Sequence, residues 1–339
     1  MPPKNDALPF YRQILIDAWR LSISHRHLWV FGFFATFAGF GGVTDILFGL
    51  HDRLSGGLPA VVAGSGQSAW AILPGFATLH VILTTSPNPA VSLLIFGLAT
   101  VVFFALFAWI VSTAVGALIG SIRKIERGGR PKLADGFRIG QSAALRVFVL
   151  NVTAKLIVAI AFLLAGATLL QQLRDKSVVA GFFYLLSFVI CAALAVVVSL
   201  VSVYATNSAV IENLPVVPAV ADGLRVLKRH WLVNIEMVIV LLLINAGLAV
   251  LALFAAMVLA VPLIFLFMFA ALVKSMTMLT IITSVTAIAL LAVIALIGSF
   301  ATTFQVSCWT LLWIRLSGRG THVPKVMRLV SWFQDKLRG

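Results

Sequence analysis

Charged residues are scarce in this sequence. They occupy 11% of its 339 positions, whereas about 25% is typical of a soluble globular domain. Acidic residues are the scarcest, with 11 Asp and Glu in all, so catalysis by paired carboxylates or a metal centre has little material. Both cysteines, Cys191 and Cys308, lie in apolar runs, which favours small core hydrophobes over a disulfide or a metal site.

Several enzyme motifs are also absent. The sequence contains no HExxH segment, no glycine-rich phosphate loop ending in GK[ST] and no CxxC pair. Asp135-Gly136 and Asp222-Gly223 resemble part of the aspartate-rich motif of intramembrane alcohol phosphotransferases, but the further aspartates of that motif are missing. We therefore expect a protein that is not an enzyme and holds no cofactor or metal.

Hydrophobic residues, by contrast, make up 61% of the chain and come in long runs. A run of about 20 apolar residues is long enough to cross the hydrocarbon layer of a membrane as a helix. The runs lack the alternation of polar and apolar residues that a membrane β-barrel requires. The sequence therefore predicts an all-α, polytopic transmembrane bundle, whose first four spans cover residues 28–50, 90–120, 147–170 and 178–204.

The last apolar block, residues 231–314, allows two interpretations. It contains only Glu236 and Lys274 as charged residues, and no polar turn divides it clearly. We favour two long spans, broken near Pro262 and Lys274, which gives six spans in total. Four spans of about 20 residues each would also fit, so eight spans in total are the alternative.

Basic residues predict the orientation. They concentrate in residues 1–27, 121–146, 207–230 and 315–339, whereas the opposite loops hold only Arg53, Arg174, Lys176 and Lys274. Because Lys and Arg are retained on the cytoplasmic side, we expect a multi-pass protein of the cytoplasmic membrane with both termini inside. The net charge of +14 is then explained by the anionic lipids of the inner leaflet, and nucleic acid is not needed as a partner.

Both ends of the chain are predicted to form amphipathic helices at the membrane surface. Near the N-terminus, Phe10, Ile14, Ala18 and Leu21 share one face. After residue 315 we expect a cytoplasmic helix over residues 316–339. Its basic side, expected to face lipid, carries Lys325, Arg328, Lys336 and Arg338. An ordinary solvated helix packed on the loops is the alternative at either end.

A five-residue motif occurs three times. It reads Asp, small, large apolar, Arg, aliphatic, and each copy precedes an odd-numbered predicted span: Asp17-Ala18-Trp19-Arg20-Leu21, Asp135-Gly136-Phe137-Arg138-Ile139 and Asp222-Gly223-Leu224-Arg225-Val226. The repeat predicts three modules, residues 1–120, 121–206 and 207–315, each an amphipathic helix followed by a transmembrane hairpin. Asp and Arg three residues apart on a helix are close enough to pair. The motif either fixes the angle at which each hairpin enters the membrane or forms a cytoplasmic docking site.

The third copy and its surroundings resemble a known family. Ala209-Val210-Ile211-Glu212-Asn213, the motif from Asp222 to Leu227, and His230-Trp231 are similar to a segment of the multi-span membrane domain attached to some bacterial glycerophosphodiester phosphodiesterases, and of its stand-alone relatives of unknown function. Pro215 and Pro218 depart from that pattern and are expected to break the helix early. The resemblance implies a six-helix bacterial membrane domain without catalytic residues, because the phosphodiesterase chemistry belongs to a separate soluble domain.

Polar residues inside the predicted spans are candidates for a binding site, since they are costly there. Lys155 with Asn151 in the third span, and Glu236 with Asn234 and Asn245 in the fifth, would form an intramembrane polar pocket if the two spans packed together. The alternative is that Lys155 and Glu236 reach the interface. Threonines recur every three residues at Thr277, Thr280, Thr283 and Thr286. Their hydroxyls either line a permeation path or bond to carbonyl groups of their own helix.

Histidines at the membrane border complete the list of candidates. His25, His27 and His230 are expected to anchor the chain at the interface, because no acid or thiol accompanies them at metal-ligand spacing. Taken together, these observations favour a non-enzymatic membrane protein that binds or organises lipid at the cytoplasmic leaflet. The alternative is a small-solute permease that uses the Lys155 and Glu236 pair.

Overall fold

The computed structural model describes residues 10–38, 88–175, 178–272 and 276–317, and all regular elements in these ranges are α-helices. In chain order they are α1 (Phe10–Ser24), α2 (Leu28–Thr36), α6 (Pro89–Glu126), α7 (Leu133–Asp175), α8 (Val178–Ile211), α9 (Val216–Arg229), α10 (Trp231–Leu272) and α11 (Met276–Ser317). Five of them are long and apolar enough to cross a membrane: α6, α7, α8, α10 and α11. The prediction of an all-α protein with several transmembrane helices is therefore confirmed.

The predicted first span begins as α2, and its part beyond residue 38 lies outside the described residues. The last apolar block forms two helices of 42 residues each, α10 and α11, rather than four. The prediction of a break near Pro262 is wrong, because α10 continues through this proline to Leu272. Proline removes one backbone hydrogen bond, whereas leaving the helix inside an apolar environment would strand several backbone groups. Lys274 lies outside the described residues.

The predicted separation of motif helix and span holds at two places and fails at the third. A turn at residues 25–27 divides α1 from α2, and His230 divides α9 from α10. In the middle of the chain, α7 runs without interruption from Leu133 to Asp175, so the second motif lies in the first turns of the same helix as the predicted span. Residues 139–147 contain no proline or turn-forming pair that would stop the helix.

The described helices meet in a compact region that we call the base. At its centre are three helix segments buried on all sides: residues 111–122 of α6, 203–211 of α8 and 302–313 of α11. These three helices contact one another pairwise. The helices that carry the motifs lie outside them, α1 against α11, the start of α7 against α6, and α9 against α8. Of the apolar face predicted near the N-terminus, Ile14, Ala18 and Leu21 are buried against protein, and the side chain of Phe10 lies outside the description.

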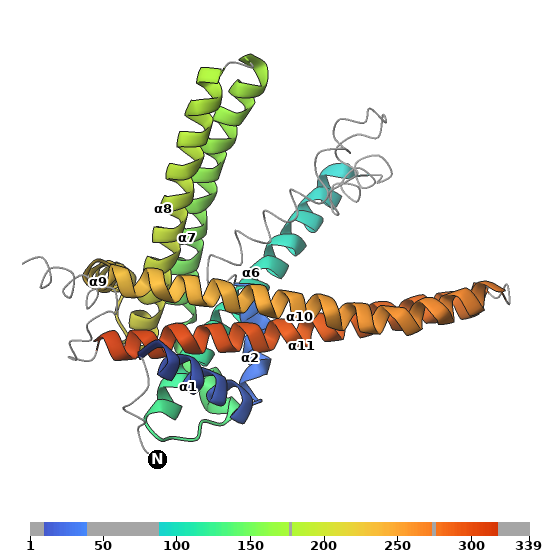
Figure 1. The fold of residues 1–339 in the computed structure, drawn as a ribbon, viewed down its shortest axis with the longest axis horizontal. Coiled ribbons are helices and arrows are strands. Elements are labelled where there is room, and N and C mark those ends of the chain that lie inside the picture. The colour runs from blue at the N-terminus through green and yellow to red at the C-terminus, as the bar shows by residue number, and fades with distance from the viewer. Residues whose placement is uncertain (1–9, 39–87, 176–177, 273–275, 318–339) are drawn as a thin grey trace, which may run out of the picture.

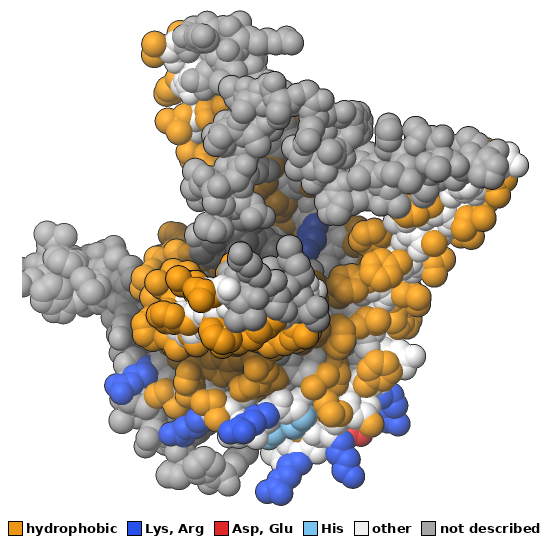
Figure 2. All heavy atoms as spheres, turned by 90° about the vertical axis from the view of Figure 1, so that its right-hand side faces the viewer, with side chains coloured by type: hydrophobic (Ala, Val, Ile, Leu, Met, Phe, Trp, Pro, Cys, Tyr) orange, Lys and Arg blue, Asp and Glu red, His pale blue; other side chains and the backbone are white. Residues whose placement is uncertain are grey.

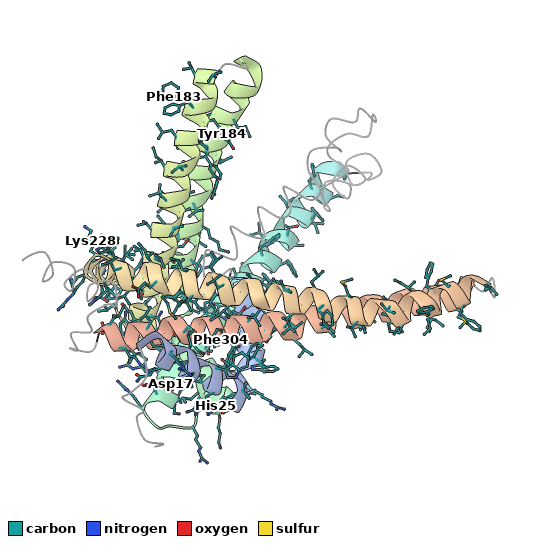
Figure 3. The ribbon with its side chains drawn as sticks, viewed as in Figure 1. Asp17, His25, Phe183, Tyr184, Lys228 and Phe304 are labelled. Atoms are coloured by element: carbon teal, nitrogen blue, oxygen red, sulfur yellow. The ribbon has the colours of Figure 1, made fainter. Side chains whose placement is uncertain are left out.

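Beyond the base the long helices form three arms that leave in different directions (Figure 1). The first arm is the outer part of α6, the second is the α7–α8 pair and the third is the α10–α11 pair. Large apolar side chains are exposed along them, for example Leu163 and Phe183, the latter near the far end of α8 (Figure 3). An apolar surface of this extent is unfavourable in water and fits the interior of a membrane.

Candidate functional site

The three copies of the motif form the first candidate site. The aspartate of each copy is partly buried and accepts a hydrogen bond from the base end of the neighbouring long helix. The donors are Arg315 of α11 for Asp17 (2.5 Å), Lys124 of α6 for Asp135 (2.9 Å) and Ser208 of α8 for Asp222 (2.7 Å). The aspartate thus fastens each motif helix to the helix on which it packs, as Figure 3 shows for Asp17 on α1 beside α11.

The small residue of each motif allows this close packing. Ala18, Gly136 and Gly223 are all buried. A Cβ atom added at Gly223 would lie 2.8 Å from the backbone oxygen of Val201, and one added at Gly136 would lie 2.8 Å from Ser121 Oγ. At Gly223 the obstacle is backbone, so a larger side chain would push α9 away from α8, whereas at Gly136 the side chains of Ser121 and Phe31 would have to shift. The fifth, aliphatic position is Leu21, Ile139 or Val226, and each packs on the hydrophobic core.

The arginine of each motif, in contrast, faces outward. Arg20, Arg138 and Arg225 are exposed. The predicted pairing with the aspartate three residues earlier occurs only in the third copy, where Arg225 lies 3.5 Å from Asp222. In the other two copies the aspartate is bonded to a base cation of another helix, so the ring of Asp/Arg pairs considered from the sequence is not formed.

The large apolar residue beside each arginine is also exposed. The exposed fractions are 47% for Trp19, 52% for Phe137 and 38% for Leu224. Trp19 keeps one edge on the protein, since its ring meets Phe300 and Phe304 of α11 at centroid distances of 5.2 and 6.0 Å. Each motif therefore presents an outward pair, which we define as the neighbouring large apolar residue and arginine of that motif. Such pairs suit a membrane interface, where an apolar group dips toward lipid and a cation stays at the headgroups.

The remaining basic side chains reinforce this charge at the base. Apart from Lys155 and Arg174, all Lys and Arg of the described residues belong to base segments, and Figure 2 shows them mostly at one end of the molecule, with apolar side chains beyond. Two of them hold the end of α8 and the segment after it: Arg123 donates to the oxygen of Ile211, the last residue of α8, and Arg146 to that of Leu214, which lies between α8 and α9. Cations at a helix C-terminus are favourable because its carbonyl groups lack partners within the helix.

A second candidate site is polar and buried. Where α8, α10 and α11 meet, Tyr204 donates a hydrogen bond to Asn234 Oδ1, and its ring stands edge-on to Trp309 with centroids 6.1 Å apart. All three side chains are at most 2% exposed. Sequence reasoning identified Asn234 but missed Tyr204 and Trp309. The available signal was the clustering of polar residues, such as Asn207 and Thr310, toward the C-terminal ends of two apolar runs.

The pocket predicted from Lys155 and Glu236 is not assembled. Lys155 is exposed on α7, Glu236 is partly buried on α10, and no ion pair joins them. Asn151 donates to the oxygen of Val147 on its own helix at 3.1 Å. Asn245 has a buried amide nitrogen without a partner among the described residues. Their functional roles stay predictions.

The predicted threonine row and histidines have ordinary structural surroundings where they are described. Thr286 bonds to the oxygen of Ile282 on its own helix at 2.7 Å, and Thr280 is exposed. The side chains of Thr277 and Thr283 lie outside the description, as do Lys325, Arg328, Lys336 and Arg338. The His25 and His27 rings meet edge to face at 5.7 Å, and His230 ends α9. Within the described residues, no cluster of His, Cys, Asp and Glu is suited to hold a metal ion.

Comparison with protein-family models, with curated proteins and with solved structures gave no match. The resemblance to the membrane domain of glycerophosphodiester phosphodiesterases therefore stays a prediction.

Proposed function

We propose that this chain is a non-enzymatic protein of the cytoplasmic membrane that binds anionic lipid at the inner leaflet through the outward pairs of its three motifs. The base faces the cytoplasm in this proposal, and the arms cross the bilayer. The observation that carries it is the exposure of the same two neighbouring positions, a large apolar residue and an arginine, in three copies whose aspartate bonds to another helix and whose small and aliphatic residues pack on the protein.

The proposed architecture is a ring of three modules. Each motif helix docks on the second long helix of the module before it, and α1 closes the ring by docking on α11 of the last module. The contacts of α7 with α6, α9 with α8 and α1 with α11 support this arrangement. Because a three-membered ring repeats the outward pair on each side, the base would offer three equivalent positions to lipid headgroups around its rim.

The expected strength of each position is modest. A basic residue close to an anionic membrane surface contributes about 1 kcal/mol of attraction, which is about a fivefold change in occupancy. Because each position binds its own lipid independently, neutralising all three arginines lowers the number of retained anionic lipids by about fivefold, and the population that carries all three lipids by about a hundredfold.

The test measures lipid retained by the full chain after extraction from membranes that contain phosphatidylglycerol and phosphatidylcholine. Native mass spectrometry counts the bound lipids for the parent protein and for the triple variant Arg20→Gln/Arg138→Gln/Arg225→Gln. The triple variant should lose its preference for phosphatidylglycerol. A charge-matched control, Arg127→Gln/Arg130→Gln/Lys228→Gln, removes three exposed cations outside the motifs and should keep most of that preference. Equal losses in both variants would show that net charge, and not the motif, attracts the lipid, and would overturn the proposal.

A further inference from the structure

Buried polar atoms without partners lie on the three helices that meet at Tyr204, Asn234 and Trp309. Asn234 Nδ2 and Trp309 Nε1 are buried donors without a hydrogen-bond partner among the described residues. On α8, one turn after Tyr204, Asn207 donates to the oxygen of Val203 on its own helix, but its Oδ1 is buried and unpartnered. On α11, two more polar atoms are buried without a partner among the described residues, Thr310 Oγ1 and Trp313 Nε1. We call this region the polar junction.

Such a concentration of orphan groups requires an explanation. Buried polar atoms in native proteins nearly always have a partner, because losing hydrogen bonds to water without replacement costs free energy. The neighbouring base positions are filled by fully buried apolar side chains, among them Leu312 and Met237. If nothing bonded to these polar atoms, leucine or phenylalanine at the same positions would give a more stable apolar core. The polar residues are therefore explained if something in the folded protein forms hydrogen bonds with them.

We infer that the polar junction holds a small, neutral, hydroxyl-bearing guest between α8, α10 and α11. Its oxygen accepts hydrogen bonds from Asn234 Nδ2 and Trp309 Nε1, and a hydroxyl hydrogen is donated to Asn207 Oδ1. The guest is neutral because amide and indole groups carry no formal charge, so an ion would be buried without compensation. Two sources share this chemistry: internal water, and a small polyhydroxyl solute such as glycerol.

This inference is independent of lipid binding at the outward pairs. Of the residues predicted from the sequence to form an intramembrane polar pocket, the polar junction includes only Asn234. Glu236 follows two residues later on the same helix, about 200° around its axis, and therefore points away from it. If the chain binds or conducts a polar solute, we therefore expect the site at Tyr204, Asn234 and Trp309 and not at Lys155.

The first experiment observes the guest directly in the full chain reconstituted in lipid nanodiscs. The indole nitrogens of the eight tryptophans are labelled with ¹⁵N, and the Trp309 signal is assigned by its loss in Trp309→Phe. Trp29 is the internal reference, because its Nε1 donates to the oxygen of Ser22 at 2.8 Å. The inference predicts a hydrogen-bonded shift for Trp309 like that of Trp29. Magnetisation transfer from water to the Trp309 signal identifies water, whereas a retained mass of glycerol after its addition identifies a solute.

The second experiment measures thermal unfolding of the double variant Tyr204→Phe/Asn234→Leu. Replacing both partners of a hydrogen bond by apolar groups of similar shape is nearly neutral or stabilising when nothing else is bound. With a guest in place, the variant loses it and melts several degrees lower than the parent. A Trp309 signal without a hydrogen-bonded shift, or a shifted one with neither water contact nor bound solute, would overturn the inference. So would a double variant that melts at or above the parent temperature.

Discussion

Gly140 lies where α7 crosses α6 at close range. A Cβ atom at this position would stand 2.1 Å from the backbone oxygen of Thr113 and 2.8 Å from the backbone nitrogen of Ala117. Since both obstacles are backbone atoms, Gly140→Ala cannot be relieved by a side-chain rotation, and the two helices must separate. Overpacking of this kind costs about 1–3 kcal/mol, against which the better helix propensity of alanine returns at most about 1 kcal/mol.

Gly247 of α10 is the matched control, because a Cβ atom there meets nothing within 4 Å. Gly247→Ala makes the same chemical change without the clash and should leave stability unchanged or slightly raised. Unfolding followed by circular dichroism in mixed micelles with increasing SDS compares both variants with the parent. We expect Gly140→Ala to be about 2 kcal/mol less stable than Gly247→Ala. Equal stability of the two variants would refute the close approach of α6 and α7.

Three further predictions test other contacts of the base in the same assay. Asp17→Asn should cost about 1 kcal/mol and more than Asp135→Asn, because the cationic partner of Asp17 is 21% exposed and that of Asp135 is 43% exposed; the reverse order would contradict the ring-closing role of α1. Burial, and secondly the charge of His25, lowers the pKa of His27, so the neutral ring favours the folded state. This contribution to the free energy of unfolding is complete above the ordinary pKa of histidine and is lost as the pH falls through the lower pKa of the folded state. His27→Gln should therefore make stability fall less steeply with decreasing pH. Arg123→Gln should cost about 1 kcal/mol by uncapping α8, whereas Arg127→Gln should be silent.

Much of the fold could be predicted because it depends on local pattern. The long apolar runs predict long helices in a protein that crosses a membrane. The break between α8 and α9 follows from the sequence around Pro215, and the structure places Asn213 at φ 58°, the left-handed conformation that commonly ends helices.

The rest could not be predicted because it depends on which distant segments meet. The aspartate of the first motif is bonded to Arg315, 298 residues away, and nothing in the local pattern favours this partner over Arg20. The polar junction has the same origin, because Tyr204, Asn234 and Trp309 come from three different helices. Pro262 was misread since the rule that proline ends helices holds for water, where exposed backbone groups find partners.

The contact of the outward pairs with lipid is the central claim, and photocrosslinking in the native membrane tests it most directly. The photoreactive residue p-benzoylphenylalanine replaces Phe137 in one variant and the fully buried Leu118 in the control. After irradiation, mass spectrometry of the purified chain identifies what each position has captured. We predict phospholipid adducts at position 137 and only crosslinks within the chain at position 118. Crosslinks to protein alone at position 137, with no lipid adduct, would contradict the account.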